Sequence, residues 1–399
     1  MDPVIYQQRC QALANSLPHD GAILCFSGKT ASRNSDVTYP FRSNSNMLYL
    51  SGCNVPDHCL VGIKTNHQQH WYLIAPKITQ HDIIWHGSDL PKNFPTAHYD
   101  AILSPEELDE LLSDRHIFIP SDQQHFISQK SSAIDPYLNK MRSIKSTEEL
   151  DYINDAIYHT IAGFAAVMSK RDQIEHETQA LSIYLGECMK RQCFEQAYQP
   201  IIAGHHRANI LHYTANNQAI PKGSMLLMDA GIEYQYYAAD ISRTFPTQKH
   251  FSSAQSKLYD VVLHAQIETL SALKSGLSWM ELNHIAKTHL AQGLIDLKIT
   301  NECVEDVIHN GTLSRYYPHG IGHSVGLDVH DTLDEKNHLK AGMVITVEPG
   351  LYCRPHHHLD EKWHNIGIRI EDTVVITENG HINLSDGLPK SIEDIEALS

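Results

Sequence analysis

The spacing of apolar and polar residues divides the chain into two stretches with different patterns. Up to about residue 140, short apolar runs alternate with amphipathic segments. Short apolar runs bounded by turn residues are typical of strands, and a repeat of three to four residues is typical of helices. The pattern predicts helices over 6–17 and 104–114 and strands over 21–28, 46–52, 58–64, 70–76 and 116–121. This order is typical of a small α/β domain with a mixed sheet.

The pattern changes near residue 145. Ser146 and Glu149 have the spacing of a capping box, which predicts that a long helix begins there. Beyond this point the sequence predicts helices over 147–169, 176–191, 253–274 and 279–294, with hairpin-like strands over 223–234, 342–350 and 366–377. Helices between antiparallel hairpins indicate an α+β domain with helices on one face. We therefore expect an α/β N-terminal domain over 1–143 and an α+β C-terminal domain over 144–399.

Composition narrows the functional classes. A chain of 399 residues with 42% hydrophobic and 20% charged residues is typical of a two-domain globular protein. The net charge of −16 argues against a broad nucleic-acid surface. The eight cysteines are scattered without a CxxC pair, which suits a reducing compartment. No apolar run approaches the roughly 18 residues of a membrane span. We expect a cytoplasmic protein with no membrane or nucleic-acid partner.

Two aspartates interrupt one predicted hairpin. Asp229 and Asp240 occupy strand positions that favour Val or Ile. A turn centred between Tyr234 and Gln235 would place them directly opposite one another, with Cβ atoms roughly 4.5–5.5 Å apart. Two buried like charges are unfavourable unless a cation accompanies them. Arg243 and a divalent metal are the candidate cations, and a solvated hairpin with both aspartates outside is the alternative.

The last two predicted hairpin segments add further carboxylates. Glu348 ends the strand over 342–350. In the following segment, alternation places Ile366, Ile368 and Ile370 on one face and Arg369 and Glu371 together on the other. Four carboxylates therefore lie on hairpin strands or at their ends. The alternative is that a glutamate at the end of a strand simply lies at a solvated edge of a sheet.

Histidines occur between these segments and before them. The stretch "YYPHGIGHSVGLDVHD" holds His319, His323 and His330 among glycines, which let a backbone approach a site closely, and His212 lies in "ILHYTANN". Any one of them alone is more often structural. Carboxylates with one histidine suit Mn²⁺, Co²⁺, Fe²⁺ or Zn²⁺. Two bridging carboxylates hold a pair of ions about 3.5–4 Å apart, as in hydrolytic two-metal centres.

The order Asp229, Asp240, His323, Glu348 and Glu371 resembles the five-ligand set of the pita-bread metallopeptidases. This creatinase/aminopeptidase-like family includes methionine aminopeptidase, prolidase and Xaa-Pro aminopeptidase. The strings "MDAGIEYQYYAADISRTFP", "HGIGHSVGLDVHD", "VEPGLY" and "GIRIED" carry the resemblance, and the second and fourth favour the proline-specific branch. The segment "YPFRSNSNMLYLSGCNVPDHCLVGIK" is similar to the N-terminal domain of bacterial aminopeptidase P.

The resemblance implies a role for each of these residues. Asp229 would chelate one metal, Asp240 and Glu371 would bridge both, and His323 and Glu348 would bind the other. Glu348 would also carry a proton to the departing proline nitrogen, and either His330 or His212 would stabilise the oxyanion. The remaining implied positions are substrate-binding His212, His319, His330 and Tyr352, and Arg369, which would orient a ligand carboxylate.

The implied activity is release of the N-terminal residue from peptides with proline in the second position. It would need two divalent ions, with Mn²⁺ expected first, in a homodimer or homotetramer. Two alternatives stay open: a prolidase restricted to Xaa-Pro dipeptides, and a metal-free pita-bread binding protein. One departure from the family is the short connection after "LDVHD", where close bacterial relatives carry a longer segment with arginines near the substrate. The extent of the peptide-binding site therefore does not transfer from them.

Overall fold

The computed structural model describes residues 1–399 except 67, 88–98, 335–337 and 399. The described chain divides into two compact units, 1–141 and 142–399. Within the described part, no helix has the length and apolar character needed to cross a membrane. Residues 335–337 of the short connection after Asp331 lie outside the described residues.

The N-terminal unit is built on a six-stranded mixed sheet with the order β6-β5-β4-β1-β7-β8. Pairs β1–β4 and β4–β5 are antiparallel, whereas β5–β6, β1–β7 and β7–β8 are parallel. One apolar face of this sheet packs around buried Leu24, Val61 and Ile117. The elements are α1 Pro3–Ser16, β1 Gly21–Phe26, β2 Ser32–Asn34, β3 Val37–Thr38, α2 Ser45–Ser51, β4 Cys59–Lys64, β5 Gln69–Ile74, α3 Gln80–His86, β6 Ala101–Leu103, α4 Leu108–Leu112, β7 Ile117–Ile119, β8 Ser131–Ala133 and α5 Asp135–Ser143. The predicted mixed α/β sheet is confirmed.

The strand predicted over 46–52 is wrong, because this segment forms helix α2. The Asn44 side chain accepts a hydrogen bond from the Asn46 N–H at the start, and Gly52 ends the helix with φ +67°. Helix α2 is buried over nearly its whole surface. A short apolar run gives no helical period in that situation, so the pattern cannot separate it from a strand.

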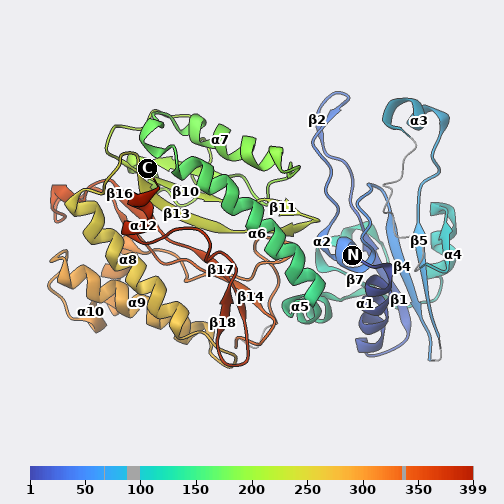
Figure 1. Ribbon diagram of the computed structural model, residues 1–399. Coiled ribbons are helices and arrows are strands. Elements are labelled where there is room, and N and C mark those ends of the chain that lie inside the picture. Colours follow the sequence, from blue (N-terminus) through green and yellow to red (C-terminus); the bar gives the residue numbers. More distant parts are fainter. Residues whose placement is uncertain (67, 88–98, 335–337, 399) are drawn as a thin grey trace. The chain divides into compact units, whose positions relative to one another are not determined.

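The C-terminal unit carries long helices around small antiparallel sheets (Figure 1). Helices α6 and α7 pack together against β9 and β12, and α8 packs against α9 and against β14–β16. The elements are α6 Thr147–Met168, α7 Glu177–Lys190, β9 Ile201–Gly204, β10 Met225–Ala230, β11 Glu233–Tyr234, β12 Tyr237–Ala238, β13 Ile241–Pro246, α8 Ser253–Ser271, α9 Trp279–Asp296, α10 Val304–His309, α11 Thr312–Tyr316, β14 Val344–Val347, β15 Gly350–Cys353, β16 Ile366–Arg369, β17 Asp372–Ile376, β18 His381–Asn383 and α12 Ile392–Ala397.

Two three-stranded sheets and one ribbon bring distant segments together. The sheets have the orders β13-β10-β9 and β14-β17-β18, and the ribbon is β15-β16. A bridge between Ser242 and Glu371 joins the start of β13 to the segment between β16 and β17, and a second bridge joins Ser324 to Ile345 in β14. Residues from four parts of the sequence therefore meet near the beginnings and ends of these strands.

The predicted register of the aspartate hairpin is wrong by two positions. Asp229 pairs with Ser242, and Asp240 lies just before β13. The turn is formed by Gln235 and Tyr236, both with positive φ (49° and 71°), one residue later than expected. Because strand side chains alternate, Asp240 still lies on the same face as Ser242 and is a diagonal neighbour of Asp229.

Candidate metal and substrate site

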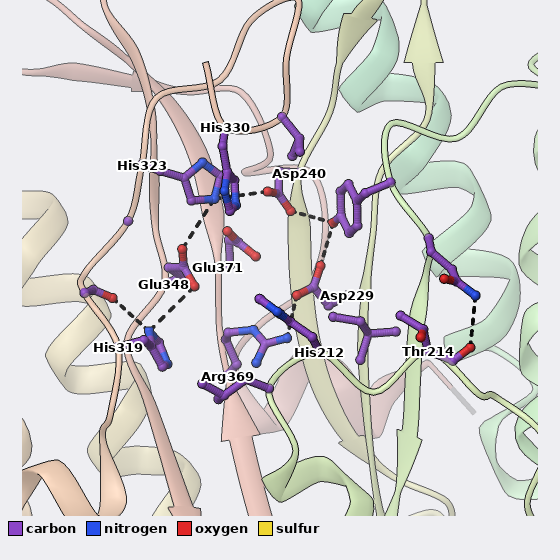
Figure 2. A pocket seen from close by; sticks show the side chains of 17 residues that line it. His212, Thr214, Asp229, Asp240, His319, His323, His330, Glu348, Arg369 and Glu371 are labelled. Atoms are coloured by element: carbon purple, nitrogen blue, oxygen red, sulfur yellow. Dashed lines mark hydrogen bonds and ion pairs between the residues drawn. The ribbon is translucent and has the colours of Figure 1, made fainter. Parts of the chain in front are cut away.

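A cavity of about 530 Å³ lies in the C-terminal unit. It is lined by residues from β9, β10, the loop before β13, the glycine-rich segment around residue 323, and the ends of β14 and β16. Figure 2 shows their side chains directed into a common space. The predicted site residues that line it are Asp229, Asp240, His323, Glu348, Glu371, His212, His319, His330 and Arg369.

The aspartate pair is held by a tyrosine and an arginine. The Tyr198 hydroxyl lies 2.5 Å from both Asp229 Oδ1 and Asp240 Oδ1. A phenol has a single O–H, so this hydroxyl can donate to only one of the two aspartates at a time. Arg369 donates to Asp229 Oδ2 over 2.5 Å. Both aspartates are nearly buried, at 8% and 5% exposure.

His323 presents one ring nitrogen to the carboxylates. Its Nδ1 lies 3.1 Å from the Ser324 carbonyl oxygen, which can only accept a hydrogen bond and therefore places the proton on Nδ1. Nε2 then faces Asp240 Oδ2 at 3.3 Å and Glu348 Oε1 at 3.5 Å. The Thr346 hydroxyl links the two elements, because it accepts from the His323 N–H and donates to Glu348.

Glu371 completes the group from the segment between β16 and β17. Its Oε2 accepts from the Ser242 hydroxyl over 2.7 Å, and the Ser242 oxygen accepts from Arg369 Nε over 2.9 Å. One ligand atom each from Asp240, His323 and Glu371 all lie within 4.8 Å of one another. These three side chains, which the sequence separates by up to 131 positions, therefore converge around one point of the cavity.

The backbone around His323 approaches β14 too closely for a side chain at Gly322. A Cβ atom there would collide with the Thr346 carbonyl oxygen. Glycine at this position lets the segment lie against the strand, so that the His323 N–H reaches the Thr346 hydroxyl. The glycine-rich composition of this stretch thus has a direct structural reason.

Burial and mutual repulsion make the charged forms of these carboxylates unfavourable. Burial raises the pKa of Glu348 to about 7, against the opposing influence of His323 and Arg369. Burial also raises the pKa of Glu371 well above its usual value, and the neighbouring carboxylates add to the effect. Asp240 has a raised pKa for the same first reason, although its hydrogen bond to His323 opposes the shift. A bound cation would reverse this balance.

The three histidines differ in protonation. Burial disfavours the charged form of His323, but the hydrogen bond to Asp240 and the nearby carboxylate charges outweigh it and raise its pKa to about 9. Burial and the positive charge of Arg369 lower the pKa of His319 to about 4. Burial and His323 lower the pKa of His330 as well. His319 and His330 are therefore neutral donors or acceptors at neutral pH.

This donor set fits divalent metal ions. Four carboxylates and one imidazole nitrogen face a common space in which the described cations are Arg369 and, when protonated, histidine. Oxygen-rich sites with one imidazole suit first-row divalent ions, and metal coordination needs the carboxylates ionised. The raised pKa values of the carboxylates also indicate a cation site, because the described side chains do not supply enough positive charge to balance these carboxylates.

Two predicted residues have other positions than expected. Tyr352 does not line the cavity but lies behind its wall, fully buried, with its hydroxyl 2.8 Å from His319 Nε2 and 2.9 Å from Arg369. Arg243, the candidate cation for the aspartates, is buried against Asp372 instead, at 2.7 Å. The cation beside Asp229 is Arg369.

Sequence reasoning missed Tyr198. This residue precedes Asp229 and Asp240 by 31 and 42 positions, in a loop before β9. Nothing in its local pattern distinguishes it from a structural tyrosine. Only the antiparallel pairing of β9 with β10, which sets Ile201 beside Asp229, brings the end of that loop to the site.

Family models match both units. The model for metallopeptidase family M24 matches residues 151–378, and the model for the aminopeptidase P N-terminal domain matches residues 6–116. The M24 match covers more than half of the chain and includes all five residues predicted as metal ligands.

Individual relatives match almost the whole chain. An Xaa-Pro aminopeptidase of Haemophilus influenzae is 34% identical, with 98% of this chain and 96% of the relative covered. The solved structure of proline aminopeptidase P II from Yersinia pestis has a TM-score of 0.94 at 31% identity and covers 100% of this chain and 99% of its own. That of Escherichia coli aminopeptidase P with the inhibitor Pro-Leu has a TM-score of 0.93 at 31% identity, covering 100% and 98%. The chain therefore belongs to metallopeptidase family M24, in its Xaa-Pro aminopeptidase (aminopeptidase P) branch, with the pita-bread fold in its C-terminal unit.

Proposed function

We propose that this protein is a dinuclear-metal aminopeptidase that releases the N-terminal residue from peptides with proline in the second position. The observation that carries the proposal is the convergence of four carboxylates and His323 in one cavity of a chain that resembles Xaa-Pro aminopeptidases over its whole length. A prolidase would differ from this proposal by cleaving only Xaa-Pro dipeptides. A binding protein would differ by holding no metal.

The proposed ligands fall into two sets around shared carboxylates. Asp229 would hold one ion and His323 with Glu348 the other, while Asp240 and Glu371 would be shared. When bound, two such ions lower the pKa of a bound water and polarise the scissile carbonyl. We infer Mn²⁺ as the natural pair because carboxylates dominate the set, with Co²⁺, Fe²⁺ and Zn²⁺ as alternatives.

The chain's own groups would position the peptide and move the proton. His330 and His212 line the cavity near the proposed ligands and can donate an N–H to the carbonyl oxygen as negative charge develops there. Glu348 would carry a proton from its carboxyl oxygen to the departing proline nitrogen. His319 is held through Nε2 by Tyr352, so Tyr352 would act by orienting His319 at the cavity wall.

The specificity for proline would come from packing. A peptide bond before proline has no N–H, so the site cannot select its substrate by a hydrogen bond from that amide. Ile201, Leu211 and Val329 provide apolar surface in the cavity wall, and the neutral His330 ring lies nearby. A hydrophobic wall of this kind discriminates by shape.

We propose a cytoplasmic location and a homodimer or homotetramer. All eight cysteines are free and seven of them are buried, which supports a reducing compartment. The oligomer rests on the family resemblance alone. Size-exclusion chromatography with light scattering would measure it.

The test of the proposed function is turnover of an Xaa-Pro-Yaa tripeptide by purified protein across Mn²⁺, Co²⁺, Fe²⁺ and Zn²⁺. We expect free Xaa from the tripeptide, no cleavage of the matched Xaa-Ala-Yaa peptide, and loss of activity after chelation with recovery on added metal. Cleavage restricted to the Xaa-Pro dipeptide would support prolidase instead. Protein that binds no metal and cleaves none of these peptides would support the binding-protein alternative.

Replacing Tyr198 by Phe is expected to weaken metal binding about tenfold with little effect on folding. The change removes the only hydroxyl that contacts both Asp229 and Asp240 among the described residues. Groups that hydrogen-bond metal ligands typically contribute 10–100-fold to affinity or activity. Calorimetric titration of Mn²⁺ into metal-free protein measures the effect. Tyr259→Phe, which removes a buried hydroxyl bonded to the Lys390 carbonyl, is the matched control. Equal affinity in wild type and Tyr198→Phe would contradict the assignment.

A further inference from the structure

The segment 205–218 supplies one wall of the cavity, and His212 lies at its centre. Leu211, His212 and Thr214 line the cavity from this segment. His212 is exposed, and within the described part of the chain its ring makes no hydrogen bond or ion pair. The position of this imidazole therefore depends on how firmly the flanking backbone is held.

The flanking backbone is held by one buried carboxylate outside the cavity. Glu177, the first residue of α7, is fully buried and accepts four hydrogen bonds. Its Oε1 accepts from the Gly204 N–H at 3.0 Å and from Arg207 Nε at 2.5 Å. Its Oε2 accepts from the Tyr213 hydroxyl at 2.7 Å and from the Gln218 N–H at 3.0 Å.

These four donors bracket the segment on both sides of His212. Gly204 and Arg207 lie before it, and Tyr213 and Gln218 lie after it. The Glu177 N–H also donates to the Gln218 carbonyl, and Arg207 donates to the Ala219 carbonyl. The segment thus leaves β9, passes the cavity and returns to the same carboxylate.

A hydrophobic contact completes the support. Leu211 and Tyr213, the two neighbours of His212, pack on the buried cluster that contains Ile201, Leu227 and Tyr352. With both neighbours turned toward that cluster and Tyr213 tied through its hydroxyl, the backbone leaves His212 free to face the cavity (Figure 2). An apolar side chain at position 177 would fill the space but would leave four donors without their acceptor, and the bonds from Gly204 and Arg207 are buried.

We propose that Glu177 is a positioning residue for the reaction: it holds the segment 205–218 so that His212 faces the substrate carbonyl. This inference rests on the proposed function, because His212 is taken to contact the substrate there. Glu177 itself does not line the cavity and lies outside the proposed metal ligands. Its loss should therefore lower turnover through His212 and leave metal binding unchanged.

The experiment compares Glu177→Gln, His212→Ala and the double variant on an Xaa-Pro-Yaa tripeptide. We expect Glu177→Gln to lower kcat/KM by about tenfold or more, since misplacement by about 1 Å can cost a hundredfold. In the His212→Ala background, the same change should cost less than about twofold, because its effect acts through the missing imidazole. Mn²⁺ stoichiometry and affinity should equal those of wild type in all variants. Glu149→Gln, which alters a buried carboxylate bonded to Tyr237, is the control and should leave kcat/KM unchanged.

Two further measurements test the role of Glu177 independently of the kinetics of Glu177→Gln. Tyr213→Phe removes one of the four donors and keeps the carboxylate, so it serves if Glu177→Gln does not fold; it should lower kcat/KM about threefold, again only when His212 is present. Hydrogen exchange over 205–218 should accelerate about tenfold in Glu177→Gln and not in Glu149→Gln. The role of Glu177 would be overturned if Glu177→Gln lowered kcat/KM by the same factor with and without His212. It would also be overturned if hydrogen exchange over 205–218 were unchanged in this variant. Wild-type protein that cleaves no Xaa-Pro peptide would count against the proposed function instead, and the exchange result would still decide whether Glu177 holds the segment.

Discussion

Replacing Asp240 by Ala is expected to abolish peptide cleavage, with a loss of at least about a thousandfold, the scale found when one member of a group that acts as a unit is removed. Asp240 lies between the two halves of the site: its carboxylate contacts Tyr198 on one side and His323 on the other. Of the proposed ligands, it and Glu371 are the pair that both ions would share. Without it, the remaining groups cannot hold two ions at the spacing that the chemistry needs.

The same change should leave the fold intact. Burial raises the pKa of Asp240, so its charged form is unfavourable in metal-free protein, and removing it relieves repulsion with Asp229. Such repulsion between strand neighbours costs up to about 1 kcal/mol. We therefore expect the metal-free variant to unfold within about 1 kcal/mol of wild type in urea, with an unchanged circular dichroism spectrum.

Two measurements decide this prediction together. Metal content after dialysis against Mn²⁺ should fall from two ions per chain to one or none, and turnover should not recover at saturating Mn²⁺. Asp155→Ala, on the exposed side of α6, is the control and should retain both metal and activity. Near-normal turnover of Asp240→Ala at saturating Mn²⁺ would refute a shared-ligand role for this residue.

Local signals in the sequence predicted the four long helices of the C-terminal unit well, but not the short helices α10, α11 and α12. The capping box at Ser146 and Glu149 is present, with Ser146 N–H donating to the Glu149 carboxylate at 2.9 Å, and α6 begins at the next residue, Thr147. A capping box needs only residues that are three positions apart, so the sequence contains all of the information. The helices predicted over 176–191, 253–274 and 279–294 are observed as α7, α8 and α9.

The strand register of the aspartate hairpin and the burial of helix α2 were harder to predict, because they depend on residues distant in the sequence. The aspartate hairpin turns at Gln235 and Tyr236 with positive φ at both, a conformation that usually shows itself by Asn or Gly. With neither residue present, the sequence carried no signal for the turn position. Helix α2 was read as a strand because its environment buries all sides, which only the surrounding unit determines.

The site itself was predictable in part. Asp229, Asp240, His323, Glu348 and Glu371 lie in long motifs whose order resembles one family, and the structure brings them to one cavity. Tyr198 and Glu177 lie outside those motifs, and Ser242 lies within one of them without a distinguishing pattern. Each of the three contacts a proposed ligand or the segment around His212. Their roles arise from strand pairing and from hydrogen bonds across 27 to 129 positions, which no local pattern encodes.

Replacing Asp372 by Asn is expected to produce the largest loss of stability, about 3–5 kcal/mol, the cost of leaving a buried charge without its partner. Asp372 follows the proposed ligand Glu371 and is fully buried, as is its partner Arg243. Five side chains donate to its carboxylate: Arg243 at 2.7 Å, Gln266 at 2.7 Å, Ser385 at 2.8 Å, Asn383 at 2.9 Å and Lys390 at 2.5 Å. An amide keeps the shape but removes the charge, and its own N–H groups would face donors.

Urea unfolding of the metal-free protein measures this loss as a lower midpoint, and Asp360→Asn, which breaks an exposed ion pair with Lys362, should leave the midpoint unchanged.

The pH dependence gives an independent check. Burial opposes the charged form of Asp372, but Arg243 and Lys390 outweigh it and hold the pKa far below its usual value. A carboxylate with a depressed pKa contributes its stability above the unfolded-state pKa of about 3.9 and loses it as the pH falls below that value. The difference in the free energy of unfolding between wild type and Asp372→Asn should therefore be largest at pH 7 and should shrink below about pH 4. A gap that is small at pH 7, or that widens on acidification, would show that the ion pair is not what joins β13 to β17, since Arg243 also donates to the Glu371 carbonyl at 2.6 Å.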